Sequence, residues 1–198
     1  MRINYKHLLV VASAAVMTFV ACDKDDDKPV IRTATSVTDL AADTAAATGQ
    51  GAKAPRYFTF ATQTLSATGT DSSKWDISFT STYNGNVTAS NGKIALVDTA
   101  FDALTTAPAD TAFKYATVGI DGFGQTGWYV YNMTTHIVSP KANRTIVLRT
   151  AAGKYAKLQM ISLYKGNPAA PTLQTPVPYL TFKYFVQANG SRNLTTIQ

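Results

Sequence analysis

Soft and aromatic side chains, the types that could hold a metal ion or an aromatic ligand, are concentrated between Gly127 and Tyr164. This segment holds Met133, Met160 and His136, which are the only methionines and the only histidine beyond the first 22 residues. Thioether and imidazole groups both bind transition-metal ions. Methionine more commonly fills gaps in a hydrophobic core. Two interpretations of Met133 therefore stand, a ligand and a core side chain.

The spacing of Met133 and His136 decides whether they can act together. On a strand that continued through both residues, their odd spacing would place the two side chains on opposite faces, about 10 Å apart along the chain. They could not then bind one ion from its two sides. A turn at Thr134-Thr135 would change this geometry. For His136 we favour a hydrogen bond within the turn that precedes Pro140.

Alternation of apolar and polar side chains predicts that this segment forms strands. The strands are expected at residues 127–133, 144–150 and 154–164. Breaks between them are expected at Ser139-Pro140 and Ala152-Gly153. On the last strand Met160 would share an apolar face with Ala156 and Leu158, so we expect Met160 in the core.

The rest of the chain carries similar strand signals. All 12 acidic residues are aspartate, and the absence of glutamate removes a residue that favours helices. Residues 29–55 have the composition of a linker, with an edge strand at about 32–37, and residues 101–104 are a short helix or turn. Further strands are expected at residues 56–60, 64–70, 74–79, 86–90, 93–97, 179–187 and 193–197. The sequence therefore predicts one antiparallel all-β domain.

The N-terminal region has the features of a lipoprotein export signal. Residues 1–21 join two basic residues to an apolar run that is shorter than the roughly 20 residues of a membrane-spanning helix. Cys22, the only cysteine of the chain, follows directly, and we expect it to be acylated; an ordinary secretory signal is the alternative. Residues 22–34 begin with an acidic run and are expected to form a flexible tether. Residues 35–198 then form the folded domain.

Charge and motifs exclude several classes of function. The whole chain carries a formal charge of +6. Residues 1–21 contain two basic residues, and residues 22–30 contain four aspartates and two lysines. These two contributions cancel, so residues 31–198 also carry a formal charge of +6. A basic domain suits anionic ligands, but no basic run indicates nucleic-acid binding. The sequence has no nucleophile elbow, phosphate loop or zinc spacing. Asp76 and Asp98 are expected to be structural and not a glycosidase pair, so no enzyme is predicted.

Several motifs together resemble the HmuY-type haem-binding surface lipoproteins of Bacteroidetes. They are RYFTF at 56–60, KWDISF at 74–79, GWYVYNM at 127–133, the stretch from Arg144 to Gly166, and PYLTFKYF at 178–185. The acidic run after Cys22 also resembles the export signal of these surface lipoproteins. The resemblance implies an all-β fold that holds haem between β-hairpins through two axial side chains. It also implies an anchor in outer-membrane lipid through Cys22, exposure at the cell surface, and a TonB-dependent haem receptor as partner.

The resemblance implies specific residues for the haem site. One axial ligand follows the aromatic run of the family, which places it at Met133 in this chain. The other family ligand lies on the preceding loop, here residues 113–125, which contains neither histidine nor methionine. Tyr115 on this loop could bind the iron as a phenolate, and His136 is the remaining candidate. The aromatic side chains expected to line the pocket are Trp128, Tyr129 and Tyr131.

The missing second ligand leaves two functions open. The first is a surface-anchored, haemophore-like lipoprotein that binds haem or a related porphyrin. The second is a member of the family that lacks haem ligation and binds a glycan or a protein. Glycan recognition would use Trp128 and nearby tyrosines as exposed stacking platforms.

Overall fold

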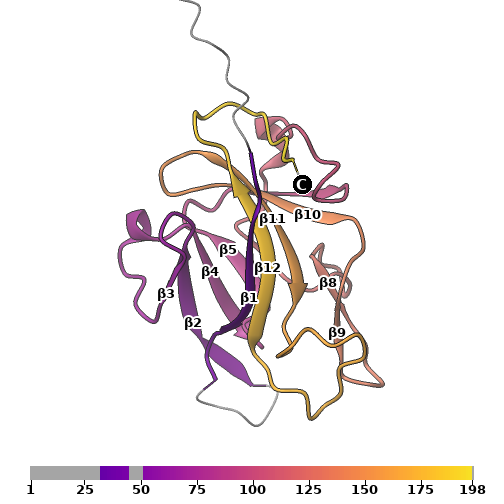
Figure 1. Cartoon of the computed structure of the whole chain (residues 1–198). Helices are drawn as coiled ribbons and strands as arrows, with labels where there is room; N and C mark the ends of the chain where they lie inside the picture. The colour runs from indigo at the N-terminus through magenta and orange to yellow at the C-terminus, as the bar shows by residue number, and fades with distance from the viewer. Residues whose placement is uncertain (1–31, 45–50, 198) are drawn as a thin grey trace, which may run out of the picture. The chain divides into compact units, whose positions relative to one another are not determined.

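The computed structural model describes residues 32–44 and 51–197, which form an all-β unit as the sequence predicts (Figure 1). The strands form two five-stranded antiparallel sheets and one separate hairpin. The first sheet contains, in spatial order, β1 (Thr35–Ala41), β12 (Tyr179–Val186), β11 (Tyr155–Ser162), β10 (Arg144–Arg149) and β6 (Ile94–Asp98). The second sheet contains β3 (Thr64–Ser66), β2 (Ala52–Thr59), β4 (Ile77–Thr82), β5 (Asn86–Ala89) and β7 (Thr117–Val118). The hairpin consists of β8 (Tyr129–Tyr131) and β9 (Val138–Pro140).

Helical structure among the described residues is limited to two short 3₁₀ turns, η1 (Ser72–Lys74) and η2 (Asp110–Ala112). Residues 101–104, for which a short helix or a turn was expected, form a turn. Within the described part of the chain, no helix has the length and apolar character needed to cross a membrane.

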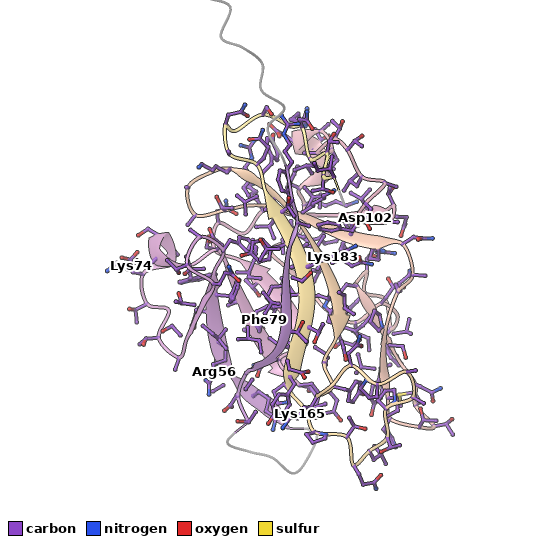
Figure 2. The ribbon with its side chains drawn as sticks, in the orientation of Figure 1. Arg56, Lys74, Phe79, Asp102, Lys165 and Lys183 are labelled. Carbon is purple, nitrogen blue, oxygen red and sulfur yellow. The ribbon has the colours of Figure 1, made fainter. Side chains whose placement is uncertain are left out.

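The main hydrophobic core joins the two five-stranded sheets. Alternation on β4 buries Ile77 and Phe79 completely, and Phe79 lies between the strands of the second sheet and β12 in Figure 2. Phe58 of β2 meets Phe182 of β12 with their ring centroids 5.3 Å apart and their planes nearly perpendicular. Edge-to-face aromatic pairs of this kind stabilise a core beyond the area that they bury. Met160 is 3% exposed in the same core, as predicted.

The first sheet is buried on its other face as well. A second hydrophobic cluster covers β10 and β11 there, and it includes Phe101 from the loop after β6 and Leu194 from the C-terminal segment. Two-sided burial explains why almost every residue of β10 and β11 is buried. Lys157 of β11 points into this second cluster and is fully buried.

Several boundaries differ from the sequence prediction. The expected break at Ser139-Pro140 lies within β9, an edge strand that pairs only with β8. Proline lacks a backbone N–H, but at this edge no hydrogen bond between strands is lost. The expected linker ends before β2, which contains Pro55 at a register shift between Lys53 and Arg56. The strand expected at 64–70 ends at Ser66. Residues 193–197 form no strand. Asn193 makes an isolated bridge with Thr106, and Leu194 and Ile197 donate backbone hydrogen bonds to Thr105 and Arg32.

Candidate functional site

The turn between β8 and β9 is closed by a dense set of backbone hydrogen bonds. Asn132 donates its N–H to the carbonyl oxygen of Ile137 at 2.9 Å, and His136 donates its N–H to the carbonyl oxygen of Asn132 at 2.8 Å. The side-chain oxygen of Asn132 accepts the N–H groups of Thr134 and Thr135, both at 2.9 Å. The bond from His136 back to Asn132 spans four residues, so this part of the chain makes one helical turn.

This turn changes the predicted relation between Met133 and His136. The strand expected to reach Met133 ends at Tyr131, and the two side chains belong to one turn instead of two faces of a strand. The bond between Asn132 and His136 closes this turn around both residues. The Met133 side chain is 63% exposed, so it is a surface thioether and not a core side chain.

His136 is held by its own hairpin. Its Nδ1 atom lies 2.7 Å from the hydroxyl oxygen of Tyr131 on β8, and the two ring centroids are 5.9 Å apart. Its backbone has a φ of 57°, in the left-handed region, which allows the chain to leave the turn and enter β9. The role favoured from the sequence is a hydrogen bond of His136 within the turn that precedes Pro140. The backbone N–H of His136 makes such a bond to Asn132, whereas the imidazole bonds Tyr131 on β8.

The loop that precedes the hairpin is fixed against β8. Asp121 donates its backbone N–H to the carbonyl oxygen of Tyr129 at 2.6 Å. A Cβ atom at Gly127 would collide with the carbonyl groups of Gly119 and Ile120, so only glycine permits this close approach. The loop and the first strand of the hairpin are thereby held together.

The carboxylate of Asp121 adds a link between the loop and the residue that follows β9. Lys141 Nζ donates a hydrogen bond to Oδ2 at 2.6 Å, and the backbone N–H of Gly127 donates to Oδ1 at 3.1 Å. The hydrogen bond from Lys141 and then that from Gly127 hold the pKa of Asp121 below its ordinary value. The carboxylate is therefore ionised at neutral pH and the link persists.

Phe123 stands at the tip of this loop. Gly122 and Gln125 exchange backbone hydrogen bonds at 3.0 and 2.9 Å, which leaves Phe123 and Gly124 in the turn with φ angles of 53° and 77°. The Phe123 side chain is 69% exposed. Sequence reasoning missed this residue, although an aromatic side chain between two glycines is a signal for display on a tight turn.

The loop and the hairpin together display apolar side chains to solvent. Five large hydrophobic side chains are exposed among the described residues, and three of them come from this region: Phe123, Val130 and Met133. We call these three the exposed apolar set. An aromatic, an aliphatic and a thioether side chain on a fixed support suit a flat apolar ligand better than a charged one.

A pocket of about 410 Å³ lies between β9, the end of β11 and the loop that follows β11. Its lining contains no charged side chain and consists of Trp128, Val138, Ser139, Pro140, Ile161, Ser162, Leu163, Tyr164, Asn167, Pro168, Ala169 and Pro171. Of the predicted site residues, only Trp128 lines it. Met133 and His136 lie outside its lining.

The predicted pocket aromatics are more buried than expected. Trp128 is 2% exposed and donates its indole N–H to the carbonyl oxygen of Gly85 at 2.8 Å. Tyr129 is 9% exposed and packs edge-on against Trp128, and burial raises the pKa of its hydroxyl. Trp128 and Tyr129 therefore cannot serve as surface stacking platforms. Tyr131 is half-buried and contacts His136.

Other candidate chemistry is structural or lies outside the described residues. Asp76 is buried and accepts two backbone hydrogen bonds, whereas Asp98 lies beside the Arg144 guanidinium, 2.8 Å from Nε. Among residues 32–44 and 51–197, no three His, Cys, Asp or Glu side chains form a metal-ligand cluster. Cys22, the expected lipidation site, lies outside the described residues.

Among known proteins, this chain is similar to several solved structures. No protein-family model matches the chain, and no curated protein matches it. Similar solved structures include the apo HmuY analog of Tannerella forsythia, at 14% identity and a TM-score of 0.43 over 83% of this chain and 100% of that chain. A protein of Bacteroides fragilis provisionally named a lipoprotein matches at 16% identity and 0.44, over 77% and 89% of the two chains.

A third solved structure, provisionally named an HmuY-like haem-binding protein of Bacteroides vulgatus, matches at 17% identity and a TM-score of 0.40, over 78% and 94% of the two chains. At these identities and scores the likenesses carry no inference about a ligand or its binding residues. Two of the three structures bear the name of the group that the sequence motifs resemble.

Proposed function

We propose that this chain is a surface lipoprotein that binds haem or a related porphyrin at the β8–β9 hairpin, with Met133 as one axial ligand. The observation that supports it is the 63% exposure of the Met133 side chain. A core methionine would have no access to a ligand, whereas Met133 is open to solvent on a turn closed by hydrogen bonds. Thioether sulfur is an established ligand of haem iron and favours the reduced state.

The exposed apolar set supplies the other requirement of a porphyrin site. A porphyrin ring presents two large apolar faces, and its binding needs apolar or aromatic side chains beside the iron ligand. Phe123, on the loop before the hairpin, is 69% exposed, and Val130, on the strand that leads to Met133, is 42% exposed. The net positive charge of the domain suits the porphyrin carboxylates.

The structure limits how the iron could be ligated. Met133 and His136 belong to one turn, so they cannot bind one iron from opposite faces of a porphyrin ring. The loop at 113–125 offers neither histidine nor methionine. We therefore propose haem held by a single protein ligand, Met133, with His136 as its alternative and with passage to a TonB-dependent receptor as the biological role.

Titration of the protein with haemin under reducing conditions tests this function. We expect a shifted Soret band for the wild-type protein. We expect Met133→Ala to bind haemin at least about tenfold more weakly, because the iron loses its protein ligand. Met160→Leu is the matched control, since it changes a buried methionine to a side chain of similar volume. A spectrum identical to that of free haem would contradict the proposal, and loss of the shift in His136→Ala alone would assign the ligand to His136.

The lipid anchor is a separate part of the proposal. Cys22→Ser is expected to move the protein from the membrane fraction to the soluble fraction, because the serine hydroxyl cannot form the thioether that carries the lipid. Fractionation with labelled fatty acid would measure this change. Incorporation of label into Cys22→Ser would contradict a lipoprotein anchored at Cys22.

A second candidate function rests on the uncharged pocket. Its volume of about 410 Å³ and its mixture of aromatic, proline, serine and asparagine side chains suit a small neutral ligand such as one end of a glycan. Trp128 would contribute there as a pocket wall and not as an exposed platform. Binding of neutral sugars that is lost in Asn167→Ala, with no haemin binding, would favour this function.

A further inference from the structure

We propose that the turn from Met133 to His136 binds a soft monovalent cation, Cu(I) or Ag(I), through the Met133 thioether and the His136 imidazole. This site does not depend on porphyrin binding. It follows from three properties of the turn: the proximity of the two side chains, the orientation of the imidazole, and the chemistry of the available ligand atoms.

Proximity comes from the hydrogen bonds that close the turn. The bond from His136 N–H to the Asn132 carbonyl closes a five-residue turn, and this turn contains both Met133 and His136. Methionine has three rotatable bonds and adapts its sulfur position readily. The exposed Met133 side chain can therefore reach an ion beside the imidazole without moving the backbone.

The imidazole is oriented by a hydrogen bond from outside the proposed ligand set. Its Nδ1 atom lies 2.7 Å from the Tyr131 hydroxyl, so Nε2, on the far side of the ring, is the nitrogen turned away from that bond. Metal-binding histidines commonly bond their second nitrogen to an oxygen atom, which fixes the tautomer and the ring orientation. Tyr131 would thus be a positioning residue.

The ligand chemistry selects the ion. Thioether sulfur and imidazole nitrogen favour Cu(I) over hard cations such as Mg²⁺ and Ca²⁺, which require several oxygen ligands. The side-chain oxygen of Asn132 already accepts two N–H groups within the turn. No cluster of three His, Cys, Asp or Glu side chains occurs in the described residues, so a structural zinc site of four protein ligands has no basis at this turn.

Silver ion is the probe of choice because it resembles Cu(I) and needs no reductant. Residues 22–198 contain two methionines, the exposed Met133 and the buried Met160. NMR spectra of this part of the chain with labelled methionine methyl groups should therefore show one signal for each. We expect Ag(I) to shift the Met133 signal with a stoichiometry of one ion per chain, and to leave the Met160 signal unchanged. The His136 Nε2 resonance should shift over the same range of Ag(I) concentration.

Variants at exposed or half-exposed positions test each atom without risk to the fold. Met133→Leu and His136→Gln should each weaken Ag(I) binding by about tenfold or more, and Tyr131→Phe should weaken it by about tenfold through the loss of imidazole orientation. Met160→Leu is the matched control and should bind as the wild-type protein does. Equal affinity in Met133→Leu and wild-type protein, or a Met133 signal that ignores Ag(I), would overturn the proposal.

The two proposals fail separately. Ag(I) binding without haemin binding would remove the porphyrin function and leave the cation site. Haemin binding through Met133 with no shift of the Met133 signal by Ag(I) would remove the cation site and leave the porphyrin function. If both hold, bound Ag(I) should block the haemin spectral shift, because the two ligands compete for one sulfur atom.

Discussion

Asp76→Ala is expected to lower the free energy of unfolding by about 3–5 kcal/mol, because a buried carboxylate that accepts two backbone hydrogen bonds is removed. Oδ2 of Asp76 accepts the N–H of Phe60 at 2.8 Å, and Oδ1 accepts the N–H of Ala151 at 2.9 Å. Phe60 follows β2 of the second sheet, whereas Ala151 lies in the turn after β10 of the first sheet. The carboxylate therefore joins the two sheets.

The size of this effect follows from the burial of the groups involved. Hydrogen bonds to a charged acceptor contribute about 1.5–3 kcal/mol each, and a buried N–H left without a partner carries its full desolvation cost. Alanine offers no acceptor, and asparagine would direct an NH₂ group at one of the two N–H donors. Asp76→Asn should consequently lose about 2–4 kcal/mol, nearly as much as Asp76→Ala.

Urea unfolding measures both variants, and Asp71→Ala is the matched control. Asp71 lies five positions earlier, caps η1 at the surface and belongs to no link between the sheets, so its removal should have a much smaller effect. If Asp76→Ala unfolded at the same urea concentration as the Asp71→Ala control, the two hydrogen bonds would not contribute as described.

The strands were predictable where apolar side chains recur at every second residue. Alternation located β4 through Ile77 and Phe79, and it placed Met160 correctly in the core. It failed at β9 and at the start of β2, because proline in these strands lies at an edge or beside a register shift. Pairing decides whether such a proline is tolerated, and pairing is not a local property of the sequence.

The candidate site was predictable in its residues but not in its geometry. The sequence drew attention to Met133 and His136, yet their relation depends on Asn132, whose side chain accepts two N–H groups and ends the strand early. An asparagine with threonines two and three residues later is a turn signal of moderate strength that also occurs in strands. Phe123 escaped notice because its exposure arises from a loop fixed by the distant Lys141.

Burial of β11 on both faces was the least predictable feature. Alternation assigns Lys157 to a solvent-facing side of the strand, but a second hydrophobic cluster covers that side. The cover consists of Phe101 and Leu104 from the loop after β6 and Leu194 near the C-terminus. These segments are distant in sequence, so no window around Lys157 could reveal them.

Lys157→Met is the second substitution with a large expected effect, a loss of about 2–4 kcal/mol in the free energy of unfolding. The fully buried ammonium donates to the carbonyl oxygens of Phe101 and Leu104 at 2.7 and 3.0 Å, and to Thr196 Oγ1 at 3.1 Å. Methionine fills a similar volume but leaves all three acceptors without this donor. The loop after β6 and the C-terminal segment would both lose their attachment to β11.

Lys183→Met is the matched control for this substitution. Lys183 lies on the neighbouring strand and contacts the same Phe101 ring, but its ammonium is partly exposed and pairs with Asp102 at 2.8 Å (Figure 2). An ion pair at the surface contributes about 0–1 kcal/mol, so this control should be only slightly destabilised. Equal losses in the two variants would mean that the buried hydrogen bonds of Lys157 have no special importance.

The pH dependence of the Lys157→Met effect distinguishes a buried charge from a neutral amine. Burial lowers the pKa of Lys157 from its ordinary value of 10.5 to about 8, with a smaller opposing effect of the Asp102 carboxylate. Between these two values the unfolded chain holds a proton that the folded chain has released, so wild-type stability rises with pH relative to Lys157→Met, by up to about 3 kcal/mol. Tyrosines titrate in both proteins and cancel in the difference. A difference that stayed constant from pH 8 to pH 10.5 would show that the three acceptors keep the ammonium protonated.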